Sequence, residues 1–399
     1  MTYNLTATLR SAVLPLLIAF TASVQAASDD IDREFEVLAN GTLNIESDSG
    51  SIDVNTWDQN LVRVRVRNAS GFEVDIDQSG NDVTVVADSR GSLFGMRRSS
   101  IGFSVDVPVQ YNVRLNTGGG NITVEDLSGE VEADTSGGNI EIGVVTGGDI
   151  HADTSGGNIE VRGATGDVEV DTSGGNITIG DVLGDVLADT SGGRIRIGDV
   201  QGDIEADTSG GSIEVGESTG RVRLDTSGGS IRAAWAMGSI VADTSGGNIH
   251  LAGSDTSVKA DTSGGNIEID AANGPVEADT SGGNITVLNA IGAVHADTSG
   301  GRIEVEITTT TGRVDGNIEL DTSGGDITLR VPSDFQASIR ANLEVSRRSR
   351  GDYRIYTDFP LTIQEDDGDI VGRGDINGGG DRVTLRTNNS DIYIQSVSN

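Results

Sequence analysis

The sequence contains no cysteine, so it can form no disulfide framework and carries no cysteine for a lipid anchor. Lysine is almost absent too: Lys259 stands against 26 arginines, and 62 acidic residues bring the formal net charge to −35. A chain this acidic disfavours nucleic acids and anionic lipids as partners. It favours basic partners or divalent cations. Alternatively, the charge only keeps a long sheet soluble and prevents pairing at its edges.

Aromatic residues are scarce at 4%, and Trp57 and Trp235 are the only tryptophans. Proline occurs five times, whereas glycine occurs 57 times. Few aromatic side chains fit a thin core and leave few platforms on which sugars could stack. Many glycines with few prolines indicate many turns rather than a disordered chain.

Long apolar runs are also missing, apart from residues 12–20 near the N-terminus, which are too few to span a membrane. Arg10 precedes this stretch, and Val24 and Ala26 supply the small residues of a cleavage site. The pattern predicts an export signal over residues 1–26, cleaved after Ala26. The mature chain is then expected to have no transmembrane segment.

What the chain does have is a repeat. The pentapeptide Asp-Thr-Ser-Gly-Gly occurs eleven times, mostly 18 residues apart, with one gap of 19 and one of 24. A fixed period of this length is typical of a solenoid, in which each repeat is one coil. The copies begin at Asp134, Asp153, Asp171, Asp189, Asp207, Asp225, Asp243, Asp261, Asp279, Asp297 and Asp321.

Four apolar columns accompany the motif, as Val168, Val170, Ile177 and Ile179 illustrate in one copy. Apolar and polar residues alternate on either side of the pentapeptide, which predicts two short strands, each with one buried face. We therefore expect an all-β parallel solenoid of about twelve coils with two strands each, rising about 4.8 Å per coil. Apolar residues do not recur every sixth position, which favours a right-handed, two-sheet coil over the left-handed hexapeptide form.

The pentapeptide itself is expected to be the corner between the two strands. Two adjacent glycines suggest a turn that needs positive φ. The aspartate is expected to accept a hydrogen bond from the backbone N–H two residues later and so cap its own corner. A second turn, usually marked by glycine, as at Gly184 and Gly202, closes each coil.

Non-repeat segments flank the array. Residues 27–115 are expected to form an N-terminal β segment and cap, residues 116–330 the solenoid, and residues 331–399 a C-terminal β segment and cap. Residues 47–52 and 116–122 resemble degenerate copies of the corner. Caps are needed because bare strand edges invite end-to-end association.

The order of these motifs resembles the bacterial putative-adhesin domain family, a β-strand repeat domain of unknown function in exported and envelope proteins. The matching stretches are Ser49-Gly50-Ser51-Ile52-Asp53-Val54, residues 103–108, the tandem Ser-Gly-Gly-Asn-Ile corners, residues 331–335 and residues 385–394. The resemblance implies a solenoid-like all-β fold and an envelope setting. It implies no catalytic residues.

The aspartate column is the sharpest candidate for ligand binding. Stacked carboxylates about 4.8 Å apart would raise one another's pKa unless hydrogen bonds or cations compensate. Calcium could bridge them, although the corner lacks the third glycine and following aspartate of the calcium-binding Gly-Gly-x-Gly-x-Asp repeat. Capping of each corner by its own aspartate is the favoured interpretation.

A β-helix enzyme acting on polysaccharides is the other alternative. It would need a local cluster of acids with a base or metal that breaks the repeat. The acids here recur evenly, and the three histidines (His151, His250 and His295) are each expected at an outward strand position, without a second histidine nearby.

Two further features are expected to be surface loops. One is a basic cluster of Arg347, Arg348, Arg350 and Arg354, and the other is a six-residue insertion around Thr308–Arg313 that explains the gap of 24.

The sequence therefore predicts a non-catalytic exported protein of the envelope, periplasmic, on the outer surface or secreted. It would act as an adhesin-like or scaffold solenoid that presents a rigid acidic surface, as a monomer, to a protein or polysaccharide partner. We expect no cofactor and no catalytic or metal residues, with calcium as the open alternative.

Overall fold

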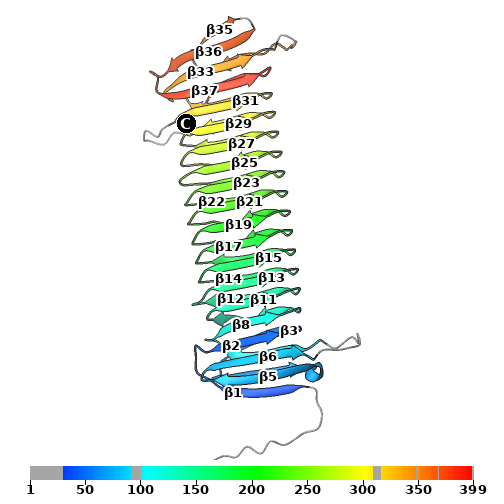
Figure 1. The fold of residues 1–399 in the computed structure, drawn as a ribbon. Coiled ribbons are helices and arrows are strands. Elements are labelled where there is room, and N and C mark those ends of the chain that lie inside the picture. The colour runs from blue at the N-terminus through cyan, green and yellow to red at the C-terminus, as the bar shows by residue number, and fades with distance from the viewer. Residues whose placement is uncertain are drawn as a thin grey trace, which may run out of the picture.

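Two long β-sheets lie face to face and form a rod in the computed structural model (Figure 1). The one helical element within the described residues is a short 3₁₀ turn, η1 (Ala69–Gly71), so this part of the chain is all-β, as expected. The structure describes residues 30–90, 100–308, 316–346, 349, 351–366 and 368–397. The predicted signal sequence lies outside these residues.

Twelve coils make up the regular part of the rod, which confirms the predicted solenoid. In each coil, one strand ends in the corner and the next strand starts after it. The first strands form the front sheet, which faces the viewer in Figure 1: β8 (Asn112–Thr117), β11 (Val131–Thr135), β13 (Ile150–Thr154), β15 (Val168–Thr172), β17 (Val186–Thr190), β19 (Ile204–Thr208), β21 (Val222–Thr226), β23 (Ile240–Thr244), β25 (Val258–Thr262), β27 (Val276–Thr280), β29 (Val294–Thr298) and β31 (Ile318–Thr322).

The second strands form the back sheet. They are β9 (Ile122–Val124), β12 (Ile140–Thr146), β14 (Ile159–Ala164), β16 (Ile177–Val182), β18 (Ile195–Ile197), β20 (Ile213–Val215), β22 (Ile231–Ala236), β24 (Ile249–Ser254), β26 (Ile267–Ile269), β28 (Ile285–Ala290), β30 (Ile303–Ile307) and β32 (Ile327–Pro332). A two-residue strand, β10 (Leu127–Ser128), pairs with the end of β12.

The strands stack in parallel and in register, so each residue pairs with its equivalent one coil away. Between β17 and β19, for example, Val186 pairs with Ile204 and Ala188 with Ala206. The four predicted apolar columns all point inward and are buried, with Val, Ile and Ala from the front sheet packed against Ile and Val from the back sheet. The core is therefore one continuous thin layer along the rod.

A fifth inward column, which the sequence analysis missed, lies at or just beyond the ends of the back-sheet strands. Single bridges link Val182 to Val200, Val200 to Ser218, and Ser218 to Ala236. All four residues are buried. Because Val, Ala and Ser share this column, its apolar pattern is weak in the sequence. Each coil thus contributes to two full sheets and to this short column of single bridges. The right-handedness of the coil stays a prediction.

The corner glycines have a different role from the one expected. None of the eleven corner pairs, all of which are described, has a positive φ. Instead, successive corners approach so closely that a Cβ on the second glycine would meet backbone of the previous coil. At Gly175 this Cβ would lie 1.8 Å from the carbonyl oxygen of Gly157, whereas at Gly174 nothing lies nearer than 3.8 Å. Glycine is needed at the second position because coils touch there.

The expected capping by aspartate is wrong, because threonine does this work. Thr172 Oγ1 donates to the carbonyl oxygen of Gly157 in the previous coil (2.9 Å) and accepts from the N–H of Gly175 (3.3 Å). In the described part of the chain, no backbone N–H donates to a corner aspartate. Alternation along the strand explains the difference: threonine points inward at the strand end, so the aspartate before it points outward.

Two other polar columns link the coils through side chains. After several corners, asparagines form a ladder in which Asn158 Oδ1 accepts from the N–H of Asn176 (2.8 Å). At the second turn, Asp185 Oδ1 accepts from the N–H of Asp203 (2.8 Å). The aspartates of the second turn therefore accept backbone N–H groups, as do Asp126, Asp181 and Asp199 elsewhere in the coils, and these bonds run between coils rather than within one turn.

The flanking segments continue both sheets across residues 115 and 331 and then change strand direction. At the N-terminal end, β2 and β3 stack on β8 and β9, and β6 and β7 stack on β2 and β3, all in parallel. Beyond them β4, β1 and β5 pair antiparallel. These strands are β1 (Ile31–Glu36), β2 (Thr42–Ser47), β3 (Ser51–Trp57), β4 (Leu61–Arg67), β5 (Phe72–Ser79), β6 (Asp82–Ser89) and β7 (Gly102–Pro108).

Both degenerate copies of the corner are corners in the structure. Residues 47–52 join β2 to β3, residues 116–122 join β8 to β9, and Thr117 Oγ1 donates to the carbonyl oxygen of Gly50 (2.9 Å).

At the C-terminal end, β37 and β38 form one more coil on β31 and β32. The front sheet then continues through β33 to the antiparallel strands β36 and β35, and the back sheet ends with β34. The bounds are β33 (Ala337–Glu344), β34 (Ile355–Thr357), β35 (Thr362–Asp366), β36 (Asp369–Ile376), β37 (Asp381–Asn388) and β38 (Ile392–Val397).

The two glycines of one corner give a matched test of this packing. We expect Gly175→Ala to destabilise the rod strongly, because its Cβ would overlap the carbonyl of Gly157, and Gly174→Ala to be nearly neutral. Overpacking of this kind typically costs about 1–3 kcal/mol or more. Thermal unfolding followed by circular dichroism measures both variants, and equal melting temperatures for the two would contradict the close approach.

Candidate interaction surface

The corner aspartates form one straight column on the outside of the front sheet. Each lies at the fourth position of its five-residue strand, and the strands are in register, so Asp189 pairs with Asp171 on one side and Asp207 on the other. The column runs from Asp134 to Asp321. We call these eleven residues the aspartate column. Parallel strand spacing places its carboxylates about 4.8 Å apart.

Several carboxyls of this column have raised pKa values, with burial as the first cause and neighbouring like charges as the second. Burial first, and then Asp189 and Asp153 on either side, raise the pKa of the Asp171 carboxyl above its ordinary value. Burial and the flanking aspartates do the same to Asp207 and Asp243. The charged form of the column therefore destabilises the fold at neutral pH.

Asp203 at the second turn behaves in the opposite way. Hydrogen bonds from the backbone and side chain of Arg221 lower the pKa of Asp203. Asp203 Oδ2 also pairs with Arg221 at 2.8 Å. Asp203 thus supports the stack through its bonds to Arg221. In the aspartate column, His151 contacts Asp153 and Arg386 contacts Asp321, and most of the other carboxylates stay open to an external cation.

Neutralising part of the aspartate column should stabilise the protein at neutral pH. We expect the triple variant Asp171→Asn, Asp207→Asn, Asp243→Asn to melt a few degrees higher at pH 7, because an opposed like-charge pair costs roughly 0.2–1 kcal/mol before screening by solvent. Since the raised pKa values mean that the folded state holds extra protons near pH 4, the gain should shrink as pH falls through that range and vanish below it.

Asp203→Asn is the control for this pH experiment. It removes an ion pair, so it should not raise the melting temperature at pH 7. A triple variant that is no more stable than the unmodified chain at pH 7 would show that repulsion within the column does not destabilise the fold.

Shallow grooves run beside the aspartate column on the front sheet. One of about 560 Å³ is lined by Glu169, Asp185, Leu187, Glu205 and Arg223, among others. A second of about 550 Å³ continues it past Lys259, Glu277 and His295. Leu187 is 42% exposed, so acidic and apolar groups share the first groove. The arrangement suits an extended cationic chain better than a compact small molecule.

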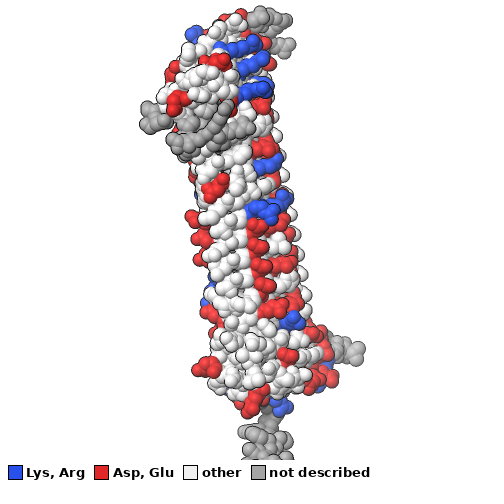
Figure 2. Space-filling model, turned by 90° about the vertical axis from the view of Figure 1, so that its left-hand side faces the viewer, with Lys and Arg blue, Asp and Glu red and all other residues white. Residues whose placement is uncertain are grey.

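Arginines gather where the front sheet ends. Asp321 pairs in register with Arg386, whose guanidinium contacts Glu319 (2.8 Å) and Asp321 (3.4 Å). A groove of about 810 Å³ over this end is lined by Arg340, Arg373, Arg382 and Arg386, together with polar side chains. Figure 2 shows acidic side chains in rows along the rod and basic ones gathered toward its upper end. This end of the front sheet therefore offers a local basic groove beside the acidic rows.

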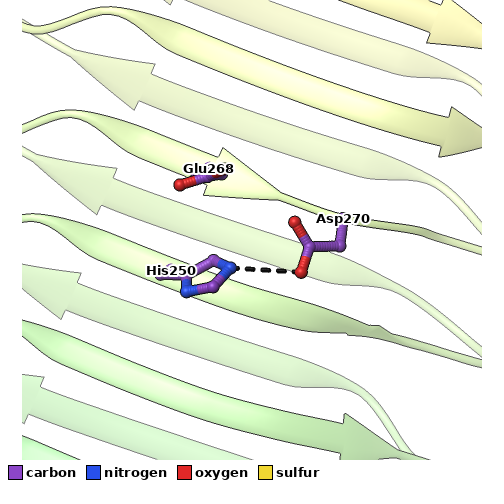
Figure 3. A group of neighbouring side chains, drawn as sticks. All are labelled: His250, Glu268 and Asp270. Atoms are coloured by element: carbon purple, nitrogen blue, oxygen red, sulfur yellow. Dashed lines mark hydrogen bonds and ion pairs between the residues drawn. The ribbon is translucent and has the colours of Figure 1, made fainter.

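The three histidines lie on the outside of strands, as expected. His151 and His295 project from the front sheet, eight coils apart, whereas His250 projects from the back sheet. No second histidine lies beside any of them in the described sequence. The register does, however, bring two carboxylates to His250, which the even spacing of acids along the sequence did not reveal (Figure 3).

The remaining candidates fall partly outside the described residues. Residues 309–313 of the insertion lie outside the described residues, and so do Arg347, Arg348 and Arg350. Arg354 is described and pairs with Asp352 at 2.7 Å. An aromatic pair that the sequence analysis overlooked lies on the back sheet nearby: Tyr356 and Tyr393 stack with ring centres 5.0 Å apart.

Comparisons with known proteins give only remote likenesses. No family model and no curated protein matches the sequence. A putative cell adhesion protein from Clostridium sporogenes is 8% identical, with 92% of this chain and 100% of that one covered and a TM-score of 0.17. Putative adhesins from Bacteroides fragilis (14% identity, 77% and 100% coverage, TM-score 0.22) and Parabacteroides distasonis (13%, 75% and 96%, TM-score 0.21) are similar in the same way.

These names agree with the family that the sequence resembles. The identities and TM-scores are too low for the likenesses to carry an argument about this chain. Among the described residues, no helix has the length and apolar character needed to cross a membrane.

Proposed function

We propose that this protein is a non-catalytic, exported, adhesin-like scaffold of the bacterial envelope, which holds a partner on a rigid acidic face. The aspartate column carries the proposal. Its carboxylates recur at a fixed spacing along the front sheet, and in the described residues none of them is bonded to backbone.

Rigidity follows from how the coils are joined. Every coil is bound to the next by paired strands and by the corner threonine, and the asparagine and second-turn ladders add bonds over part of the array. The carboxylate spacing is therefore set by the backbone and changes little when a partner binds. A partner with regularly spaced positive charges gains from many weak contacts at once, which raises overall affinity without any single strong site.

The partner class follows from the chemistry of the face. Carboxylates beside exposed apolar groups such as Leu187 fit a basic, partly apolar protein segment or a cationic polysaccharide. Nucleic acids are repelled. The predicted signal over residues 1–26 supports export, and cleavage after Ala26 would release the rod to the periplasm, the outer surface or the medium.

Calcium binding along the column is the second candidate, favoured by the raised pKa values of unsatisfied carboxylates. A bound divalent cation would relieve the repulsion and stabilise the folded state by mass action. If calcium binds, it raises the melting temperature and a chelator reverses the change. An equal melting temperature with calcium and with chelator would rule out this candidate.

Gene deletion with complementation tests the scaffold proposal. We expect deletion to reduce attachment of cells to their surface or to one another, and the unmodified gene to restore it. The variant Asp171→Asn, Asp207→Asn, Asp243→Asn should restore much less, although it folds at least as stably. A tagged copy should fractionate outside the cytoplasm.

The matched control changes the same charge on the other face: Glu141→Gln, Glu160→Gln, Glu306→Gln on the back sheet should restore attachment fully. Equal loss in both variants would show that only net charge matters. Turnover of an acidic polysaccharide by the purified protein would contradict the non-catalytic assignment.

A further inference from the structure

One cluster on the back sheet breaks the regular pattern of the coils. His250 on β24 pairs in register with Glu268 on β26, and Asp270 follows two residues later. One ligand atom from each of the three residues lies within 4.8 Å of the other two. Figure 3 shows the imidazole and the Asp270 carboxylate facing each other, with Glu268 on the neighbouring strand. We propose that this cluster binds a divalent first-row transition metal ion of the Zn²⁺ type.

The donor set fits such an ion. An imidazole nitrogen and two carboxylate oxygens are ligands that Zn²⁺ accepts, and three protein ligands leave a fourth position open. His250 Nε2 lies 3.1 Å from Asp270 Oδ2. Two ligands about 2.1 Å from a tetrahedral ion lie roughly 3.4 Å apart, so a small outward shift of this pair, which is 3.1 Å apart, gives the required separation. The exposed Glu268 side chain can close the remaining gap by rotation.

Neighbouring residues explain how the cluster forms. Ala252 stands on the same face of β24 as His250, where its small side chain leaves room for Asp270 to turn toward the imidazole. The N–H of Asp270 donates to the carbonyl oxygen of Leu251 (3.0 Å), and Asn289 Nδ2 donates to the carbonyl oxygen of Asp270 (3.0 Å). The backbone that carries the carboxylate is thus held from both adjacent coils.

Charge also favours a divalent cation here. Glu268 and Asp270 bring two negative charges beside the imidazole, and a divalent ion bound there would cancel them. One coil earlier, Arg232 pairs in register with His250 and lies on the side away from Glu268. Cations that prefer oxygen ligands, such as calcium, gain nothing from the imidazole. The cluster should therefore bind transition metals in preference to calcium.

A second histidine provides a matched control. His151 also has two acidic neighbours, but they contact opposite ring nitrogens: Asp153 lies 2.9 Å from Nε2 and Glu169 lies 3.7 Å from Nδ1. One ion cannot bind a single ring nitrogen of His151 together with both carboxylates. Both histidines have two acidic neighbours, but only at His250 does the geometry suit one metal ion.

Calorimetric titration of the whole purified chain with ZnCl₂, in excess CaCl₂ to occupy diffuse acidic sites, tests the proposal. We expect one zinc per chain, with His250→Ala, Glu268→Gln and Asp270→Asn each lowering the affinity at least about tenfold, since even outer-shell partners of a metal are worth 10–100-fold. His151→Ala should leave the affinity unchanged. Cobalt titration should give a visible absorption band that His250→Ala abolishes.

Circular dichroism melts of the variants exclude loss of folding as the cause. Zinc binding that is equal in His250→Ala and the unmodified chain, or that His151→Ala weakens as much, would overturn the proposal. The proposed scaffold function is on the other face of the rod and does not depend on this result.

Discussion

The close approach of successive corners is the constraint on which the rest of the rod depends. The second glycine of each corner lies against the backbone of the previous corner. The threonine hydroxyl donates a hydrogen bond to the previous coil and accepts one from the second glycine of its own corner. Any side chain at that glycine would push the coils apart. Because this contact recurs in every coil, small errors in register would add up along the rod, which explains why the pentapeptide is kept unchanged while other turns vary.

The aspartate column is a consequence of that constraint. Threonine must point inward at the strand end to reach the previous coil, and alternation then turns the preceding residue outward. The burial of Thr172 and the exposure of Asp171 therefore have the same cause, the alternation of side chains along the strand. The column costs stability through repulsion, as its raised pKa values indicate, and natural proteins often retain such a cost where a surface has a use.

The sequence predicts the architecture well and the roles of particular residues less well. Period and apolar columns were enough for the solenoid, the two strands per coil, and the corners at residues 47–52 and 116–122. They misassigned the glycine pair and the capping residue, since contacts between coils cannot be inferred from one repeat considered alone. The His250 cluster was within reach: residues 18 and 20 positions later are its neighbours in register, a spacing that the period itself supplies.

Amide hydrogen exchange at one corner tests the central claim most directly. Thr208 Oγ1 donates to the carbonyl of Gly193 (2.9 Å) and accepts from the N–H of Gly211 (3.2 Å). Thr208→Val keeps the shape and removes both bonds, so the Gly211 amide should exchange about tenfold faster or more, as a loss of 1–3 kcal/mol implies. Thr208→Ser, which keeps the hydroxyl, should restore most of the protection. Unchanged exchange in Thr208→Val would contradict the account.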